Sequence, residues 1–571
     1  MPTDASGPTP PPPRPTPPPA LPPSFDLTSR PWVPVQRLDG TEAELSLTEV
    51  FEQAAQIRRL VGEVPTQDFA LLRLLLAILH DAIDGPEDIE DWADLWDEGR
   101  GELPADRVRD YLGEHRDRLD LLHPTAPFLQ VADLRTAKGE YSSLDPIVAD
   151  VPNNARFFTM RAHGAERLTF AEAARWLLHA HAYDTSGIKS GAVGDPRLKG
   201  GKVYPQGVGW SGNLGGVYVE GDDLQRTLLL NLIAFDTDGL RADSDQDAPA
   251  WRRAQGTVQP LKGAEAEIRP HGLRDLYTWQ SRRVRLHHDG EAVHGVLLAY
   301  GDPLTPRNKH DREPMTAWRR SPAQEKKLRE STVYLPRDHD PARAAWRGLG
   351  ALVTGRVRGA EQRQEAAKVV RPRVLDWISL LTFEGILPKD FLVRARLVGA
   401  VYGTQQSVID EIVDDAVAMP VVLFHDRDSA LTQTAIDAVN DAEEAVTVLG
   451  DLATALADAA GADGEGPRAT ARDRGFAELD EPFRKWLRGL DTTEPPLEQR
   501  RAWQLTAHEI VFRLGAELMD TAGEAAWTGR IVATKKGSVW LTASRADLRF
   551  RSALRRALPL TNTDHSPQEE Q

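Results

Sequence analysis

Residues 183–216 are the part of the chain whose composition best suits contact with a ligand. Ten glycines lie in the 30 residues 187–216. Because glycine has no Cβ, the main chain at these positions can approach a ligand closely and adopt positive φ. Main-chain amides and lysine side chains bind phosphates, and a slim main-chain ridge can enter the minor groove of DNA. The same composition is typical of a long surface loop without a ligand. Cations and aromatic residues interleave with the glycines: Tyr183, Lys189, Arg197, Lys199, Lys202, Tyr204 and Trp210.

A formal G-x-G-x-x-G pattern occurs within this stretch, at residues 207–212. A dinucleotide site requires a buried strand before the pattern and a helix after it. Here Tyr204-Pro205-Gln206 precedes the pattern, and residues 215–219 after it have the composition of a strand. The pattern therefore does not predict a nucleotide site.

Histidine and aspartate stand side by side at His80-Asp81 and at His425-Asp426. Such pairs occur in metal-dependent phosphohydrolases, whose sites need further His and Asp ligands. His80 ends an apolar helical pattern, which favours a position in or beside the core. The sequence has no H-E-x-x-H motif and no G-x-S-x-G nucleophile elbow. A His-Asp phosphohydrolase or nuclease is the alternative enzymatic interpretation.

Charge is distributed unevenly along the chain. The net charge is −17, but residues 303–373 hold 17 Lys and Arg against 8 Asp and Glu, and residues 530–556 hold 8 against 1. A net acidic chain does not coat nucleic acid by bulk attraction. Two basic segments on an acidic body indicate either local nucleic-acid contact or solvated helix faces. The chain has no cysteine, which excludes disulfides and thiolate metal sites and favours a reducing, cytoplasmic location.

The sequence pattern predicts the elements that must position these residues. It indicates an α+β chain, with a large mixed α/β N-terminal domain followed by a C-terminal four-helix bundle. We expect the mixed domain over residues 25–424 and the bundle over residues 425–560, where long amphipathic patterns are joined by short breaks. Residues 1–24 and 561–571 are expected to be disordered tails, the first of them proline-rich and without a signal-peptide core. The longest apolar run, residues 69–79, is too short to span a bilayer, so no membrane partner is expected.

Local signals predict individual elements of this architecture. Asp39-Gly40 predicts a hairpin turn, and a capping box at Ser46 predicts a helix running through residue 60. A second, apolar helix starts at Pro65. Further expected elements are a helix over 169–181, strands over 284–287 and 292–298, helices over 344–354 and 360–370, and a last helix capped by Ser544.

Several motifs in the chain resemble those of the large-subunit family (CasA) of the type I-E CRISPR Cascade complex. The resemblance covers essentially the whole length after the proline-rich tail. Each motif is modest alone, but their order and spacing together are specific. The segments are Ser-Arg-Pro-Trp-Val-Pro-Val at 29–35, His-Pro at 123–124 with Pro-Phe-Leu-Gln at 127–130, Tyr-Asp-Thr-Ser-Gly-Ile-Lys-Ser-Gly at 183–191, and Gly-Gly at 215–216 with Asp-Leu-Gln-Arg-Thr-Leu-Leu-Leu-Asn at 223–231.

The resemblance implies a non-catalytic subunit of an RNA-guided antiviral complex. In that family a guide RNA reads the target by base pairing, and the protein reads a short flanking motif before the duplex opens. The motif is read from the minor groove by a glycine loop, a lysine and a glutamine wedge. The chemical degeneracy of this groove suits tolerant recognition of several motifs. The implied partners are the guide RNA, double-stranded target DNA, the other Cascade subunits and a recruited helicase-nuclease.

Residue by residue, the resemblance implies three sets of DNA-reading positions. The glycine loop falls on Asp184, Thr185, Ser186, Gly187, Ile188 and Lys189, where only Gly187 is glycine although better-known relatives have several. The wedge falls best on Gln364, with Gln362 as the neighbouring choice. No lysine of this chain matches the family's minor-groove lysine directly. We take Lys309 in the basic segment as the candidate for that role.

The resemblance also implies a guide-RNA contact, and the last predicted helix adds a contact to the DNA backbone. The RNA loop falls on Asn154, Arg156, Phe157, Phe158 and Thr159, whose aromatic pair suits base stacking or the core. Three arginines share one face of the last helix and suit phosphates, although simple solvent exposure explains them as well: Arg545, Arg549 and Arg556. No metal or cofactor is expected. A purely structural ribonucleoprotein scaffold is the second alternative, beside the phosphohydrolase.

Overall fold

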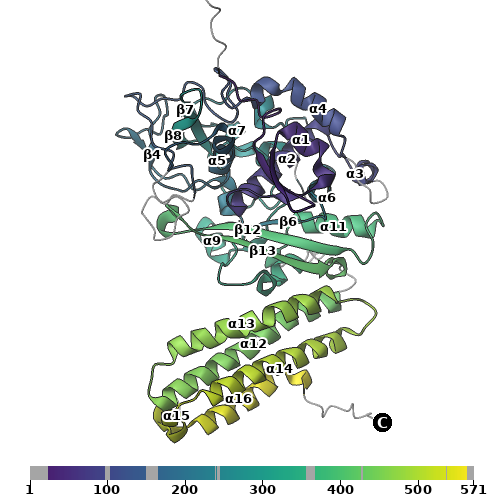
Figure 1. Cartoon of the computed structure of the whole chain (residues 1–571), viewed down its shortest axis with the longest axis vertical. Helices are drawn as coiled ribbons and strands as arrows, with labels where there is room; N and C mark the ends of the chain where they lie inside the picture. The colour runs from purple at the N-terminus through teal and green to yellow at the C-terminus, as the bar shows by residue number, and fades with distance from the viewer. Residues whose placement is uncertain are drawn as a thin grey trace, which may run out of the picture.

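The computed structural model describes residues 23–96, 103–149, 165–237, 240, 245–354, 367–425, 429–534 and 537–561. The expected guide-RNA loop (residues 154–159), both wedge candidates, Gln362 and Gln364, and nearly all of the two expected tails lie outside these ranges. Figure 1 shows a large part that mixes helices and strands above a bundle of long helices. The predicted α+β class is confirmed.

A small antiparallel sheet opens the described chain, with the strand order β2-β1-β3. The turn between the first two strands is confirmed, because Gly40 lies there with φ of +86°. The strands are β1 (Val33–Arg37), β2 (Glu42–Leu45) and β3 (Ile57–Leu60).

The first helix is shorter than the sequence predicts. α1 (Leu47–Glu52) carries the expected capping box, in which Ser46 and Glu49 satisfy each other's backbone N–H groups. Its predicted extension through residue 60 is wrong, because residues 57–60 form β3 on the free edge of β1. Ile57 and Leu60 are buried there, so pairing and burial outweigh a weak helical preference.

α2 (Pro65–Ile83) is the central helix of the mixed part and is buried along almost all of its length. α5 (Phe170–Tyr183) packs against it, and His179 Nε2 lies 2.9 Å from Thr66 Oγ1 across the contact. The other helices of the mixed part are α3 (Ile89–Trp96), α4 (Ala105–Glu114), α6 (Leu224–Asn231), α7 (Ala264–Ile268), α8 (Leu273–Tyr277), α9 (Pro322–Leu328), α10 (Gly350–Val353) and α11 (Arg373–Phe383).

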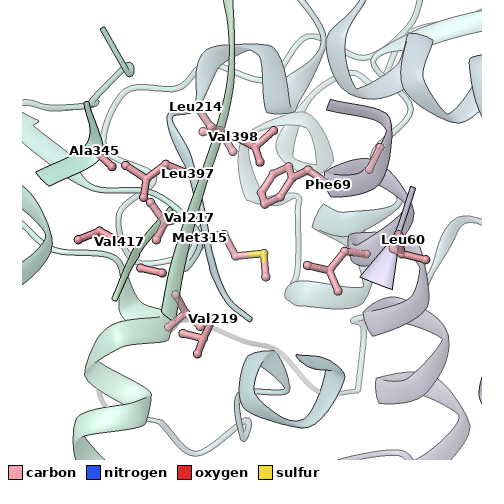
Figure 2. Close-up of a cluster of buried hydrophobic side chains, with 14 of the residues drawn as sticks. Leu60, Phe69, Leu214, Val217, Val219, Met315, Ala345, Leu397, Val398 and Val417 are labelled. Atoms are coloured by element: carbon pink, nitrogen blue, oxygen red, sulfur yellow. The ribbon is translucent and has the colours of Figure 1, made fainter. Parts of the chain in front are cut away.

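A three-stranded antiparallel sheet, in the order β13-β12-β6, covers one side of α2. β6 (Gly216–Val219) is the strand expected after the G-x-G-x-x-G pattern, whereas β12 (Leu392–Tyr402) and β13 (Ile409–Pro420) were not predicted. Figure 2 shows Phe69 of α2 gathered with Val217 and Val398 of the sheet into one buried cluster.

The mixed part also contains a separate hairpin and a second small three-stranded sheet. The predicted strand pair is confirmed as a hairpin of β7 (Arg282–His288) and β8 (Val293–Tyr300). β9 (Trp318–Arg320) lies between β10 (Tyr334–Pro336) and β11 (Val369–Val370). The helix expected over residues 360–370 is therefore wrong at its end, because residues 369–370 pair with β9.

The C-terminal part is a bundle of four long helices. Trp503 is fully buried between them and donates its indole N–H to the Ala438 carbonyl (2.9 Å). Thr542, not Ser544, caps the last helix. The elements are α12 (Ser429–Ala460), α13 (Glu465–Arg488), α14 (Pro496–Asp520), α15 (Glu524–Thr528), the hairpin of β14 (Arg530–Thr534) and β15 (Gly537–Leu541), and α16 (Ala543–Ala557). Among the described helices, none combines the length and the apolar composition that crossing a membrane requires.

Candidate nucleic-acid interface

The glycine loop lies at the junction between a buried helix and an exposed hairpin. The N–H of Asp184 donates to the Ala180 carbonyl (3.1 Å), where α5 ends. Five residues after Asp184 the chain enters β4 (Lys189–Ser190), which pairs with β5 (Lys202–Val203). In Figure 1 β4 lies at the left edge of the mixed part. The loop is thus held at both ends and presented at the margin of the molecule.

A buried ion group fixes the base of this loop. Asp184 accepts from Lys189 Nζ (2.8 Å) and from Arg282 Nε, and all three side chains are buried. Burial alone would raise the pKa of the Asp184 carboxyl, but Lys189 and Arg282 together hold it below its ordinary value. Two cations therefore face one carboxylate beneath the loop. Asp184 and Lys189 are less accessible to a ligand than the sequence motif suggests.

Arg282, which no sequence motif singled out, holds the loop's main chain. Its Nη2 donates to the carbonyls of Asp184 (2.9 Å), Thr185 (3.2 Å) and Gly207 (2.9 Å). Its guanidinium also lies over the ring of Tyr300. The sequence offers only an indirect signal for this role: Arg282 stands two residues before the strand predicted over 284–287, and a charge that the fold buries needs partners.

The polar groups of the loop's middle also point inward. The Ser186 N–H donates to the Gln406 carbonyl (2.7 Å), and the Ser186 hydroxyl accepts from the Gly207 N–H (3.2 Å). The Tyr300 hydroxyl donates to the Gly187 carbonyl (2.6 Å). What the loop presents outward is the half-buried Thr185 and Gly187 and the exposed Ile188 side chain.

The glycines of this region divide into those that the fold requires and one that it does not. A Cβ at Gly191 would overlap the Leu198 side chain and approach the Gly201 carbonyl, and one at Gly209 would lie about 2.5 Å from the main chain of Ala182. A Cβ at Gly187 would meet no heavy atom within 4 Å, and its φ lies outside the left-handed region. Gly187 thus leaves open space next to the loop's main chain.

Other motifs of the resemblance build the fold. Asn231 exchanges hydrogen bonds with both main-chain groups of Val219 (2.9 and 2.7 Å). The Gln130 side chain joins the Leu121 carbonyl to the Leu286 N–H. The second half of the glycine stretch, residues 207–212, leads through a short 3-10 turn into β6, which confirms that it lacks the strand-to-helix setting of a dinucleotide site.

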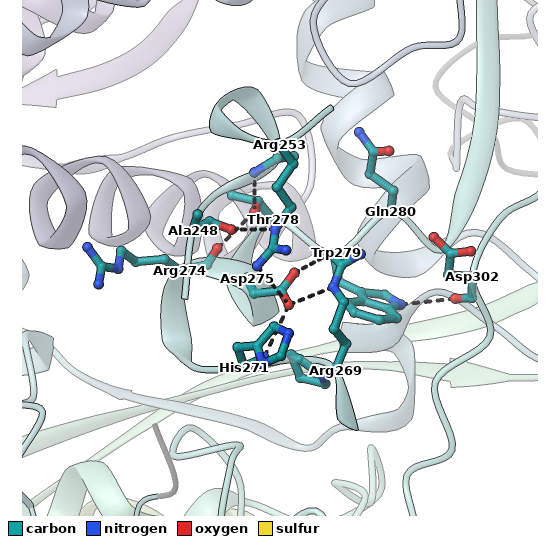
Figure 3. A network of polar contacts seen from close by, with 12 residues as sticks. Ala248, Arg253, Arg269, His271, Arg274, Asp275, Thr278, Trp279, Gln280 and Asp302 are labelled. Atoms are coloured by element: carbon teal, nitrogen blue, oxygen red, sulfur yellow. Dashed lines mark hydrogen bonds and ion pairs between the residues drawn. The ribbon is translucent and has the colours of Figure 1, made fainter. Parts of the chain in front are cut away.

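A polar network precedes β7 in the chain (Figure 3) and reaches Arg283 through Asp302. Buried Asp275 pairs with Arg269 (2.5 Å) and Arg253 (3.2 Å). The Trp279 indole donates to the Asp302 carbonyl (2.9 Å), and the Asp302 carboxylate pairs with Arg283 (3.0 Å). The start of β7 is therefore fixed by charge-assisted bonds.

The remaining predicted DNA and RNA contacts have different placements. Lys309 is half-buried in an irregular segment, where its carbonyl accepts from the N–H groups of Arg312 and Glu313. Gln362 and Gln364 fall in sequence between α10 and β11. Ser142 and Leu168, which flank the expected guide-RNA loop in sequence, both pair with β8.

The three arginines predicted on the last helix are all exposed. Arg545 donates to the Trp540 carbonyl (2.6 Å). Arg551, also exposed and on the same helix, donates through Nε to both carboxylate oxygens of Asp547 (3.0 and 2.8 Å). Arg545, Arg549 and Arg556 therefore offer their positive charge to solvent, while Arg551 is neutralised by its neighbour.

The histidines that suggested metal chemistry have structural environments. His80 is fully buried, lies 2.9 Å from the Gly85 carbonyl through Nδ1, and stacks on Phe235. Burial lowers the pKa of His80 to about 4. Asp81 pairs with Arg252 and Arg274 (2.9 and 3.1 Å). Within the described ranges no three His, Asp or Glu side chains gather as metal ligands would.

Comparison with known proteins bears on this arrangement. The family model described as CRISPR-associated protein Cse1 matches residues 26–514. The crystal structure of Thermobifida fusca Cse1 superposes with a TM-score of 0.87 at 65% identity, over 95% of this chain and 99% of that one. The CRISPR-associated protein CasA/Cse1 of Thermus thermophilus is 33% identical over 305 residues, which span 52% of this chain and only 55% of that relative.

A chain of a CRISPR RNA-guided surveillance complex has the same fold, with a TM-score of 0.66 at 18% identity, over 93% of this chain and all of that one. The family model covers most of the chain, and the Thermobifida fusca match extends over nearly all of it. The resemblance seen in the sequence motifs is therefore confirmed: this chain belongs to the CRISPR-associated protein Cse1 family.

Proposed function

We propose that this chain is the subunit of an RNA-guided Cascade complex that recognises the motif flanking a target in double-stranded DNA, through the minor groove. The observation that carries the proposal is the glycine loop. Asp184, Ser186 and the Gly187 carbonyl are bonded inward, and on the outer side the Cβ position of Gly187 is open, with no heavy atom within 4 Å. A ridge of this kind fits a narrow groove that main-chain groups can enter.

The buried charge beneath the loop supports a DNA ligand. Lys189 and Arg282 face the single carboxylate of Asp184, so the base of the loop carries an excess positive charge. Buried charges are screened less by salt than exposed ones. This charge attracts the phosphates on either side of the groove without itself contacting a base.

After recognition, the chain would help to open the duplex so that the guide RNA can pair with one strand, and then recruit the helicase-nuclease that cuts. Gln364, or Gln362, is the proposed wedge, Lys309 the proposed minor-groove lysine, and residues 154–159 the proposed guide-RNA contact. The chain supplies no chemistry in this proposal and works in the cytoplasm. The net charge of −17 limits its affinity for random DNA.

Reconstitution tests this function against its alternatives. A complex assembled without the chain should form R-loops poorly and without regard to the flanking sequence, and adding the chain should restore both speed and motif dependence. Motif dependence that persists without the chain would contradict the proposal and favour a scaffold. Metal-dependent cleavage by the isolated chain, lost in His80→Ala, would favour the phosphohydrolase.

A further inference from the structure

The outer side of the β4–β5 hairpin is unusually apolar. Of the 16 large hydrophobic side chains that are exposed among the described residues, four lie within residues 188–204: Ile188, Val193, Leu198 and Tyr204. Ile188 and Tyr204 are the most exposed of these, at 58% and 60%. Clustered exposure of this kind marks an interaction surface, whereas single exposed hydrophobic residues need no explanation.

The strand register brings the two most exposed residues together. Lys189 pairs with Val203 and Ser190 with Lys202. Continued by one residue beyond the paired strands, this register sets Ile188 opposite Tyr204. Directly opposite residues on an antiparallel pair have their Cβ atoms about 5 Å apart. The loop's outward apolar side therefore consists of one aliphatic and one aromatic side chain, next to the open main chain of Gly187.

Tyr204 lies on a short segment of main chain that is fixed at both ends. The residue before it, Val203, is buried and paired with Lys189. Three residues after it, Gly207 is bonded to Ser186 and to Arg282. An exposed ring on a main chain fixed at both ends has a defined position at low entropic cost, as a contact group requires.

The surroundings of this pair favour a nucleic-acid ligand. Lys199 and Lys202 are exposed on the same hairpin, and Lys189 and Arg282 lie beneath it. Aromatic rings interleaved with cations are typical of surfaces on which unpaired bases stack, because every base has a π-face and every nucleotide a phosphate. An acidic protein partner would not require an exposed ring beside an open glycine.

We propose that Tyr204 stacks on a base exposed when the duplex opens next to the flanking motif. The absence of a side chain at Gly187 lets the main chain enter the groove, and Tyr204 stabilises the first unpaired base. The inference rests on the proposed function, because it assumes that the loop binds target DNA. Tyr204 is then a positioning group for opening and contributes little to the choice of motif.

Substitution of Tyr204 in the assembled complex tests this inference. The probe is a target duplex with 2-aminopurine at the first pair beside the motif, whose fluorescence rises when the base unstacks. Loss of one base–aromatic stack should slow opening by Tyr204→Ala roughly tenfold. Tyr204→Phe should keep most of the rate and Tyr204→Leu should not. Phe383→Ala, which removes another exposed ring (66% exposed), should change nothing.

Two readouts separate failure of this inference from failure of the proposed function. A target with that step already mispaired should restore Tyr204→Ala to the wild-type rate, and the preference for the accepted motif should be unchanged in this variant. Opening by Tyr204→Ala at the wild-type rate, or equal rates for Leu and Phe, would overturn the stacking role alone. Wild-type complex that opens all flanking sequences equally would overturn the proposed function itself.

Discussion

At the residue scale, the glycine loop contains two kinds of group: side chains that support the loop from within and residues that face outward. Asp184 and Lys189 face each other in a buried ion pair, and Ser186 bonds to Gly207. These side chains hold the loop's shape. Gly187 and Ile188 form its outer side. The resemblance to CasA singled out this segment, but sequence spacing alone does not reveal which way each side chain points.

Alanine substitutions distinguish the two kinds of glycine by stability. Gly187→Ala should leave the thermal midpoint unchanged or slightly higher, because its Cβ meets nothing and Ala restricts the unfolded chain by about 0.5 kcal/mol. Gly191→Ala should lower the stability by about 1–3 kcal/mol, because its Cβ overlaps Leu198 and Gly201. Gly113→Ala is the control, because Gly113 is exposed on α4 and a Cβ there would also meet no heavy atom within 4 Å. A loss of stability in Gly187→Ala equal to that in Gly191→Ala would show that the fold needs both.

At the element scale, α2 and α5 form the rigid support from which the loop emerges. Three histidines on these helices are buried: His80, His179 and His181. Burial lowers the pKa of His80 and His181 to about 4 and that of His179 to about 3. Each is therefore neutral in the folded chain over a pH range in which the unfolded chain binds a proton.

This linkage predicts loss of stability in mild acid. The unfolded histidines protonate below pH 6.5, and the folded ones only near pH 3–4. The stabilisation is thus complete above pH 6.5 and falls as the pH drops toward 4, by about 1.4 kcal/mol per unit for each histidine. Urea midpoints of His80→Leu should fall less steeply from pH 7 to pH 4.5 than those of the wild type. Equal slopes would contradict a buried, neutral His80.

The last helix carries a separate, electrostatic prediction. Replacing Arg545, Arg549 and Arg556 with Gln should weaken DNA binding by the assembled complex equally for all flanking motifs. The salt dependence of binding, as log K against log salt, should become shallower by about 0.9 for each phosphate that the variant no longer neutralises. Arg551→Gln is the matched control, since Asp547 already neutralises Arg551. An unchanged slope in the triple variant would mean that these arginines are only solvated.

Some of these elements have local sequence signals and others do not. The long helices and the β7–β8 hairpin were predictable, because strong periodicity and turn residues are local signals. β12 and β13 were missed, although they build the sheet that covers α2. Much of β13 is half-exposed and rich in acidic residues, so its pattern lacks the alternation that marks a strand. β3 was missed because its pairing with β1 is not local: the paired residues lie 20 to 25 positions apart in the sequence.

At the scale of the whole molecule, the bundle is joined to the mixed part by specific contacts. Trp346 stacks on Phe483 of α13 at 4.2 Å between ring centres and donates to Asp480 (2.8 Å). Arg484 of α13 pairs with Asp415 of β13 (3.1 Å). Figure 1 shows the bundle below β12 and β13. The exposed arginines of α16 therefore lie in the bundle, whereas the glycine loop lies in the mixed part. Lys199 and Lys202 are exposed on the β4–β5 hairpin, so exposed positive charge occurs in both parts of a chain whose net charge is −17.

The central claim is that the outer side of the glycine loop reads the flanking motif. The most direct test is the ratio of dissociation constants of the assembled complex for a target with an accepted motif and for the same target with that motif scrambled. In a complex that carries Gly187→Ala, the two dissociation constants should become nearly equal, because a methyl group then fills the space into which the groove would fit. Its affinity for a pre-opened target without a flanking duplex should not change. A ratio equal to the wild-type value in that variant would contradict the account.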